Sequence, residues 1–309
     1  MTELAFVTYD VFTEKRFGGN PLAVFPDAGD LDIAEMQTIA REFNLSETVF
    51  VSPVAGKPLH RRLRILTPNY ELPFAGHPTV GTAVALAELG AFPWAEKQNA
   101  VDIVFEEGVG PVPVRIERRQ DRPLYATLSM PRLPERGPDG PDRNGLARVL
   151  GLDVERLSKE DSSACYGAGV PFTIVPVRDA EALAAIALDL GAWRQLMAET
   201  WGKALFVIVL SDLRDKREIR ARMFPPAMGI SEDPATGAAV VALAGFLAEK
   251  KLVPQQSSFA CTVRQGEEMG RPSRLALEMD FAEGRLQAIR LGGAAVAVSR
   301  GTFLIDADR

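Results

Sequence analysis

The chain has 309 residues, of which 47% are hydrophobic and 25% are charged, which is enough apolar material for a packed core and suits two domains better than one. Its net charge of −6 is opposite to the basic surface that a phosphate backbone requires, so nucleic-acid binding is not expected. The sequence shows no signal-peptide pattern and no run of roughly 18 apolar residues. We therefore expect a soluble, cytoplasmic protein without a membrane partner.

In chain order, the first part of the sequence alternates short strand-like runs with two helical patterns. Met36, Ile39, Ala40 and Phe43 recur at helical spacing and predict an amphipathic helix that ends near Asn44. A second helix, predicted at about 78–89, has no clean polar face. Runs that favour strands lie at 4–9, 22–25, 48–52, 63–66, 101–105, 112–116 and 125–130.

The middle of the chain, residues 131–141, carries four prolines and few apolar side chains, which predicts a linker. We therefore expect one half at 1–130 and another at 142–309, with the last strands, after about Ala294, left free to return to the first half. Gly292 and Gly293 predict a bend in a sheet. The second half shows helical patterns near 180–190 and 234–250, and strand-like runs at 172–177, 205–210, 219–224, 275–279, 286–289 and 294–298.

A short motif occurs twice, once in each half. Gly76-His77-Pro78-Thr79-Val80-Gly81-Thr82-Ala83-Val84 is echoed by Glu232-Asp233-Pro234-Ala235-Thr236-Gly237-Ala238-Ala239-Val240. In each copy a polar residue, a proline and a glycine precede small apolar residues, a pattern typical of the start of a buried helix. We therefore expect an α+β fold of two pseudo-symmetric halves, each a curved, mostly antiparallel sheet around a central helix. The two helix starts predict a site for an anionic ligand.

Three titratable residues are candidates for chemistry. His77 and Asp233 are predicted to head the two helices, although a buried histidine bonded to backbone and a simple N-cap are the alternatives. Glu47 starts an apolar strand, where burial would raise its pKa toward the range of a general base. A solvated strand end is the alternative. The Gly18-Gly19-Asn20-Pro21 loop brings backbone, with Asn20, close to a ligand, or else forms a plain hairpin turn.

Other side chains argue against metal and cofactor sites. Cys165 and Cys261 are far apart in sequence and predict reduced, buried thiols. With His60 and His77 as the only histidines, no metal site is expected. Neither a dinucleotide-binding nor a phosphate-loop fingerprint is present. We expect no cofactor.

Four motifs in order closely resemble the PhzF-like isomerase family of phenazine biosynthesis. They are Phe17-Gly18-Gly19-Asn20-Pro21, Asn44-Leu45-Ser46-Glu47, Ala75-Gly76-His77-Pro78 and Asp233-Pro234-Ala235-Thr236-Gly237. The resemblance implies a diaminopimelate-epimerase-like fold, usually a homodimer, with neither metal nor organic cofactor. It implies that Glu47 is the acid–base residue that moves a proton between carbons of a small cyclic amino acid. It also assigns Gly76, His77 and Asp233 to substrate binding and support of proton transfer.

The motifs also define the expected binding residues and one departure from the family. Asn20, Gly76, Thr236, Gly237 and Ala238 are expected to contact a small carboxylate substrate. Phenazine-pathway members carry a serine where this chain has Ala238, which puts the phenazine precursor itself in question more than the chemistry.

Two other hypotheses stay open beside the isomerase. One is an amino-acid or hydroxy-acid epimerase or racemase in which Glu47 and either His77 or Asp233 are opposed bases. The related epimerases use two cysteines in the helix-start motifs, and this chain has neither. The other is a small-acid-binding protein without catalysis.

Overall fold

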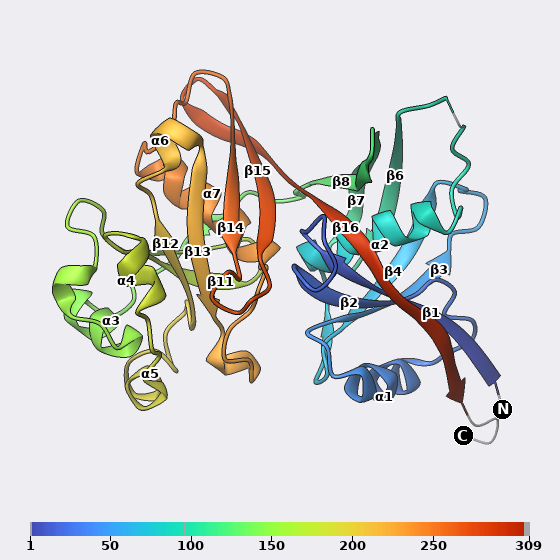
Figure 1. Cartoon of the computed structure of the whole chain (residues 1–309), viewed down its shortest axis with the longest axis horizontal. Coiled ribbons are helices and arrows are strands. Elements are labelled where there is room, and N and C mark those ends of the chain that lie inside the picture. Colours follow the sequence, from blue (N-terminus) through green and yellow to red (C-terminus); the bar gives the residue numbers. More distant parts are fainter. Residues whose placement is uncertain (1, 96, 306–309) are drawn as a thin grey trace. The chain divides into compact units, whose positions relative to one another are not determined.

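The computed structural model describes residues 2–95 and 97–305. The chain divides into two compact units, one of Met1–Pro131 with Gly292–Arg309 and one of Arg132–Leu291 (Figure 1). The described elements include no helix long and apolar enough to cross a membrane.

The first unit is a sheet that closes around a helix. The strand order is β1-β2-β3-β4-β6-β7-β8, and β16 neighbours both β8 and β1. Most pairs are antiparallel, but β2–β3 and β4–β6 are parallel. The strands are β1 (Thr2–Val11), β2 (Asn20–Phe25), β3 (Thr48–Pro53), β4 (His60–Leu66), β5 (Glu71–Leu72), β6 (Ala100–Glu107), β7 (Gly110–Arg119), β8 (Arg122–Ser129) and β16 (Arg285–Ile305).

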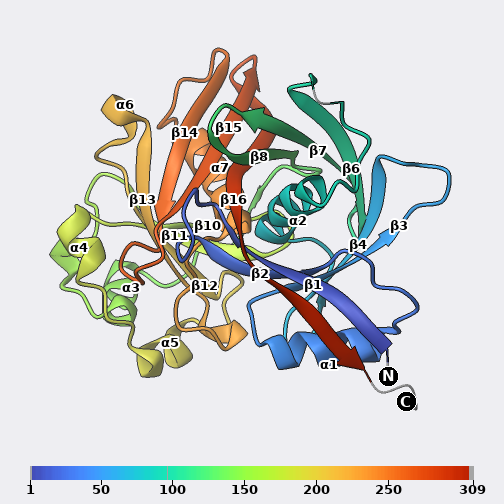
Figure 2. The same ribbon diagram turned by 45° about the vertical axis from the view of Figure 1, so that its right-hand side comes forward.

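Two helices belong to this unit. The central helix α2 (Gly76–Glu88) packs against β1, β2, β3, β7 and β8 and is buried from Gly76 to Leu86 (Figure 2). Gly81 allows the close approach, because an added Cβ would lie 2.5 Å from a Val11 methyl carbon. The amphipathic helix α1 (Ile33–Phe43) covers a separate cluster with Phe25 and Phe50. Both predicted helices of the first half are thus confirmed.

The second unit repeats this plan with more helices. Its strand order is β15-β14-β13-β12-β11-β10-β9, with β11–β12 and β13–β14 parallel, and α7 packs on β9, β10, β11 and β15. The strands are β9 (Glu135–Arg136), β10 (Ala164–Gly167), β11 (Pro171–Pro176), β12 (Ala204–Val209), β13 (Glu218–Phe224), β14 (Ser258–Gln265) and β15 (Ser273–Ala282). The helices are α3 (Arg143–Leu150), α4 (Ala180–Ala184), α5 (Leu190–Leu196), α6 (Leu213–Lys216) and α7 (Gly237–Glu249), with 3₁₀ turns at Val154–Arg156 and Pro226–Met228.

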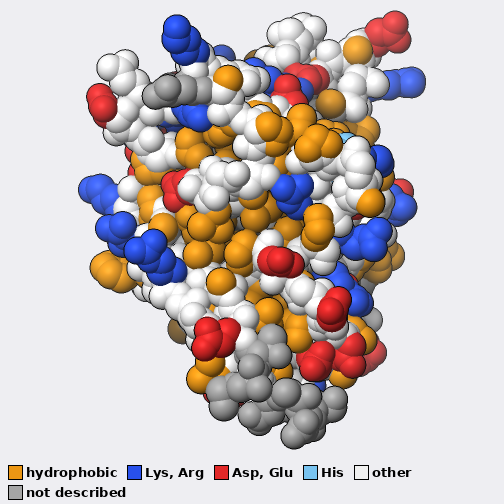
Figure 3. Space-filling view, turned by 90° about the vertical axis from the view of Figure 1, so that its right-hand side faces the viewer, with side chains coloured by type: hydrophobic (Ala, Val, Ile, Leu, Met, Phe, Trp, Pro, Cys, Tyr) orange, Lys and Arg blue, Asp and Glu red, His pale blue; other side chains and the backbone are white. Residues whose placement is uncertain are grey.

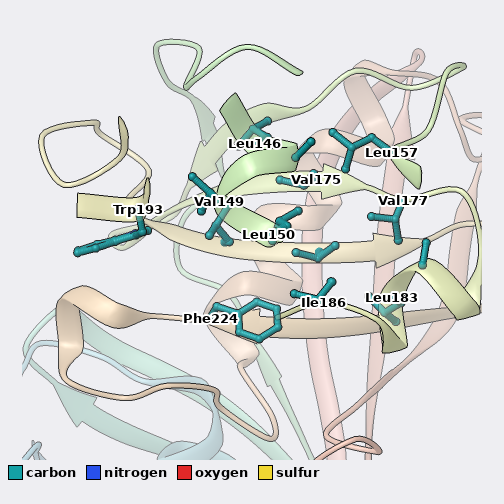
Figure 4. Close-up of a cluster of buried hydrophobic side chains, with 14 of the residues drawn as sticks. Leu146, Val149, Leu150, Leu157, Val175, Val177, Leu183, Ile186, Trp193 and Phe224 are labelled. Carbon is teal, nitrogen blue, oxygen red and sulfur yellow. The ribbon is translucent and has the colours of Figure 1, made fainter. Parts of the chain in front are cut away.

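A second core lies between the sheet and the outer helices of this unit. Leu146, Val149 and Leu150 of α3 meet Val175 of β11 (Figure 4). Trp193 of α5 lines the same core, and its indole N–H donates to a backbone carbonyl at 2.9 Å. This cluster covers the face of the sheet that α7 leaves open, so both faces are packed.

The structure differs from the sequence-based boundaries in several places. Residues 292–309 group with the first unit, the return that the sequence had left open, because β16 continues through Gly292 and Gly293 and pairs with β1. The linker predicted at 131–141 contains the short strand β9. The helix predicted at 180–190 is two short helices. The prediction omitted α3, β10 and β14.

Candidate active site

Three of the predicted residues, each from a different motif, lie together in the first unit. The Nε2 atom of His77 lies 3.5 Å from Oε2 of Glu47, and the Nδ1 atom of His77 lies 3.5 Å from the amide nitrogen of Asn20. His77 and Asn20 are buried, whereas the Glu47 side chain retains 16% of its exposure. A carboxylate that is partly accessible and backed by a buried imidazole can exchange a proton with a small ligand.

Local structure places Glu47 beside His77. Helix α1 ends at Asn44, whose left-handed conformation (φ 50°) turns the chain toward β3. Strand β3 then runs parallel to β2, with Thr48 opposite Ala23. Glu47 immediately precedes β3, and Asn20 begins β2. The two motifs are therefore brought to the same region of the sheet.

The imidazole of His77 is kept neutral by its surroundings. Burial lowers its pKa to about 3, although a ring N–H that donates to the Pro21 carbonyl acts in the opposite direction. The 3.5 Å separation from Glu47 is longer than the roughly 2.9 Å of a good N–H···O hydrogen bond. His77 therefore approaches the carboxylate without forming an ordinary ion pair.

The first turn of α2 carries a second buried carboxyl group. Helix α2 has Ala75 as its N-cap and lacks a side-chain cap, and Gly76 is its buried first residue. The Thr79 hydroxyl lies 2.8 Å both from the Ala75 carbonyl and from Oε1 of Glu107 on β6. Burial raises the pKa of Glu107 to about 8, with the Thr79 hydrogen bond opposing. Glu107 is therefore largely protonated at neutral pH.

In the second unit, the predicted residues lie in a turn before α7. Asp233 is buried, and its backbone N–H donates to the Met223 carbonyl at 3.0 Å. The Thr236 hydroxyl donates to the Asp233 carboxylate. Gln265, at the end of β14, bonds to both residues and is buried. The Asp233 carboxylate is thus held as a hydrogen-bond acceptor.

The residue before Asp233 anchors the same turn to the sheet. Glu232 forms a bidentate ion pair with Arg222 of β13, with both N–O distances at 2.8 Å. Arg222 is itself buried and also donates to the Leu183 carbonyl at 3.0 Å. Because such pairs fix geometry at both ends, the chain enters the turn at a defined position.

The two helix starts are not related as the sequence echo predicts. The echo pairs His77 with Asp233, but α2 starts at Gly76 and α7 starts at Gly237. His77 is the second residue of its helix, and Ala238 holds the same place in α7. Asp233 lies four residues before the first residue of α7 and does not cap it, because Thr236 is the N-cap. The prediction that Asp233 heads its helix was therefore wrong, although Gly237 and the partly exposed Ala238 do start the helix.

Three buried polar residues of these regions were not predicted from the sequence: Gln265, Glu107 and Arg222. One usable signal for Gln265 was its place in alternation with Phe259, Cys261 and Val263, all of which are buried on one face of β14. A polar side chain at such a position needs internal hydrogen bonds.

The two cysteines are free and buried in the second unit. Burial raises the pKa of the Cys261 thiol to about 12 and also raises the pKa of Cys165, so both remain thiols. Among residues 2–95 and 97–305, no cluster of three His, Cys, Asp or Glu side chains has the arrangement of metal ligands.

Residues 9–301 match the family model of phenazine biosynthesis-like proteins. An uncharacterised isomerase of Mesorhizobium japonicum is 41% identical over 97% of this chain and 98% of its own. Trans-2,3-dihydro-3-hydroxyanthranilate isomerase of Pseudomonas aeruginosa is 33% identical over 96% of this chain and 98% of its own.

Solved structures agree with the sequence comparison. The crystal structure of a PhzF-family protein of Bacillus anthracis matches with a TM-score of 0.87 and 26% identity, covering 99% of this chain and 100% of that one. A hydroxyproline epimerase of Agrobacterium vitis shares the fold, with a TM-score of 0.62 at 13% identity, over 99% of this chain and 94% of its own. The α+β, epimerase-like fold is confirmed. The chain belongs to the PhzF family of phenazine biosynthesis-like proteins and is an isomerase.

Proposed function

We propose that this isomerase moves a proton between carbons of a small, carboxylate-bearing cyclic amino acid, with Glu47 as the acid–base group and no cofactor. The observation that carries the proposal is the contact between the partly exposed Glu47 carboxyl and the buried, neutral His77, at 3.5 Å. A neutral imidazole at this distance can orient the carboxyl group for proton exchange with a ligand.

The proposed reaction conserves all atoms of the substrate. Glu47 takes a proton from carbon, the C–H electron pair delocalises into a conjugated system, and a new O–H bond forms on Glu47. The same O–H then gives the proton to another carbon, which restores the carboxylate. His77 orients Glu47 during both steps, and Asn20 contacts the other edge of the imidazole.

The binding roles of the remaining residues are part of the proposal. Gly76 and Gly237 are the first residues of helices that lack side-chain caps, and the N–H groups at such ends favour negative charge. Asp233 would accept from an amino or hydroxyl group of the substrate, and Thr236 and Ala238 would line its surroundings. In these assignments the helix starts bind the substrate carboxylate, and Asp233 binds the amino or hydroxyl group of the substrate.

The substrate named for the Pseudomonas aeruginosa relative gives the first compound to test. Purified protein in D₂O would be followed by proton NMR with trans-2,3-dihydro-3-hydroxyanthranilate and a panel of cyclic amino acids. We expect isomerisation or deuterium uptake at carbon, and we expect Glu47→Gln to lower turnover by about 10²- to 10⁴-fold.

Glu42→Gln is the matched control, because Glu42 is exposed near the end of α1 and should leave turnover unchanged. Full activity in a folded Glu47→Gln protein would contradict the proposal. Inversion at a single carbon of one amino acid would instead favour the epimerase or racemase. Ligand-dependent stabilisation that is insensitive to Glu47→Gln, with no exchange, would favour a binding protein.

We also propose a homodimer. Apolar side chains gather near the middle of the face in Figure 3, with charged side chains around them, and exposed apolar patches are typical of subunit contacts. Sedimentation equilibrium at several concentrations would measure the state directly. A monomer at all concentrations would contradict this part of the proposal.

A further inference from the structure

Gln265 makes three hydrogen bonds to one turn of the second unit. Its amide nitrogen donates to the Asp233 carbonyl at 2.6 Å and to the Thr236 hydroxyl at 3.1 Å. Its amide oxygen accepts from the Thr236 backbone N–H at 3.1 Å. The side chain is 1% exposed. The Gln265 amide group therefore links Thr236, the residue before α7, to Asp233 in the same turn.

The surroundings of Gln265 hold this amide in place. Its register partners are Ala221 on β13 and Ser273 on β15, neither of which carries a charge. The next residue, Gly266, has a φ of +77°, and an added Cβ there would lie 2.7 Å from the Pro234 carbonyl oxygen. The backbone after β14 thus packs directly against the turn. Nothing larger than glycine fits at this position without displacing backbone.

We propose that Gln265 is a positioning residue for substrate binding through Asp233. The Thr236 hydroxyl donates to the Asp233 carboxylate, and Gln265 donates to that hydroxyl, so Thr236 has its single proton directed at Asp233. Gln265 also fixes the Asp233 backbone. The inference rests on the proposed function in one respect, because it takes Asp233 to contact the substrate.

The amide is the group that this role needs. A side chain must donate to two oxygens and accept from one N–H within the same turn, and an uncharged carboxamide does both. Loss of the amide leaves a buried carbonyl and a buried N–H without these partners, which costs free energy at the turn. The expected result is a looser start of α7 and a carboxylate that is less well aimed.

Two variants test the proposal, with a control at the other end of the same helix. Gln265→Leu removes all three bonds, and Gln265→Glu keeps an acceptor while its protonated form can still donate. Gln255→Leu is the control, since Gln255 donates to the Ala248 carbonyl near the end of α7. Amide hydrogen exchange at Thr236, Gly237 and Ala238 gives a readout that does not depend on activity.

We expect exchange at these amides to become at least tenfold faster in Gln265→Leu and to stay unchanged in Gln255→Leu. With trans-2,3-dihydro-3-hydroxyanthranilate as substrate, KM should rise about tenfold in Gln265→Leu, an effect of the size expected when one hydrogen bond is lost. The fall in kcat should be smaller. In Gln265→Glu, kcat/KM should fall progressively as pH rises. The ionised carboxylate cannot donate to the Asp233 carbonyl and is repelled by the Asp233 carboxylate.

Unchanged exchange at Thr236 in both Gln265 variants would overturn the inference, even if Glu47→Gln abolishes turnover. A change in KM that appears equally in Gln255→Leu would also overturn it, because the effect would then be one of helix stability. If Glu47→Gln keeps full activity while the Gln265 variants behave as expected, only the proposed role of Glu47 fails.

Discussion

The starts of α2 and α7 are the two most similar places in the molecule, and their differences are informative. Both helices are 13 residues long, begin with glycine and lack a side-chain cap. The second residue of α2 is His77, which lies against Glu47, and the second residue of α7 is Ala238. The carboxylate near α7 comes from the preceding turn. A common framework thus carries a buried histidine beside a glutamate in one unit and a hydrogen-bonded aspartate in the other.

The largest expected effect is on the pH dependence of stability, and it comes from Glu107, the buried carboxyl group beside α2. The carboxylate beside α7, that of Asp233, instead accepts a hydrogen bond from Thr236. The pKa of Glu107 is raised in the folded chain from 4.5 to about 8. Below about pH 4.5, Glu107 is protonated in both the folded and the unfolded chain and does not lower the free energy of unfolding. As pH rises toward about 8, the unfolded chain ionises Glu107 before the folded chain does, so the free energy of unfolding falls. Glu107→Gln should remove this loss, on the order of 5 kcal/mol when complete.

Urea unfolding of Glu107→Gln and the natural chain at several pH values measures this difference. The two proteins should be similarly stable near pH 4.5, and the variant should become the more stable one toward pH 8.5, as the pKa shift implies. Glu106→Gln is the neighbouring control, because Glu106 is paired with Lys57 near the surface. A stability difference that does not vary with pH would contradict the buried state of Glu107.

Making the start of α2 resemble that of α7 should impair catalysis next most strongly. His77→Ala places alanine at the second position of both helices and removes the group that we propose orients Glu47. We expect kcat to fall by about 10²-fold, with a smaller change in KM. Steady-state kinetics on the isomerisation measure it. An unchanged kcat would show that His77 is a packing residue.

The neutral His77 also predicts how stability responds to acid. The pKa of His77 in the folded chain is lowered from 6.5 to about 3. The contribution of neutral His77 to the free energy of unfolding is therefore fully present above about pH 6.5 and is lost as pH falls toward 3. His77→Gln should make unfolding less sensitive to pH over that range. The control is His60→Gln, since His60 is only partly buried. Equal acid sensitivity in natural and His77→Gln proteins would contradict the buried, neutral state.

A smaller effect is expected in the second unit. Thr236→Val keeps the shape of the side chain but removes the hydroxyl that donates to the Asp233 carboxylate. We expect kcat/KM to fall about tenfold, mainly through KM, as for loss of one hydrogen bond to a charged group. Ligand titration by calorimetry would separate binding from turnover. A fall in kcat alone would indicate that Asp233 takes part in proton transfer.

The smallest expected effect is at Ala238. Ala238→Ser adds a hydroxyl at a partly exposed position in the first turn of α7, the residue that phenazine-pathway members carry. We expect stability to change by less than about 0.5 kcal/mol and the preference among cyclic amino acids to shift toward the phenazine precursor. Competition between two substrates in one NMR tube measures that preference. Identical preferences would remove position 238 from substrate choice.

Much of this comparison could be predicted from sequence, because it rests on local patterns. The spacing of Met36 and Ile39 predicts α1, and the apolar runs predict α2 and α7. The motifs that contain Asn20, Glu47 and His77 also converge in space as parts of one set. Local patterns were sufficient for the helices, whereas the grouping of these three motifs was implied by the family resemblance.

Features that depend on distant contacts could not be predicted. The predicted starts of the two helices were inexact because the repeated motif was aligned on its proline and glycine residues. A helix instead begins where its backbone hydrogen bonds start, which is at Gly76 in α2 and at Gly237 in α7. Gln265 is 29 residues from Thr236, and its polar character alone gave no sign of its partner. The exchange of residues 292–309 between units depends on pairing between the two ends of the chain.

Strand β16 has a consequence for the order in which a newly made chain can fold. Its last part, from Ala295 to Ile305, supplies the antiparallel partner of β1, so the first sheet cannot close until the chain has been synthesised through Ile305. Residues 132–291 form a compact unit that needs none of those last strand residues. On the ribosome, the unit in the middle of the sequence can therefore fold before the unit that contains the N-terminus. Until then, the edge of β1 that β16 later covers is unpaired and open to pairing with other strands.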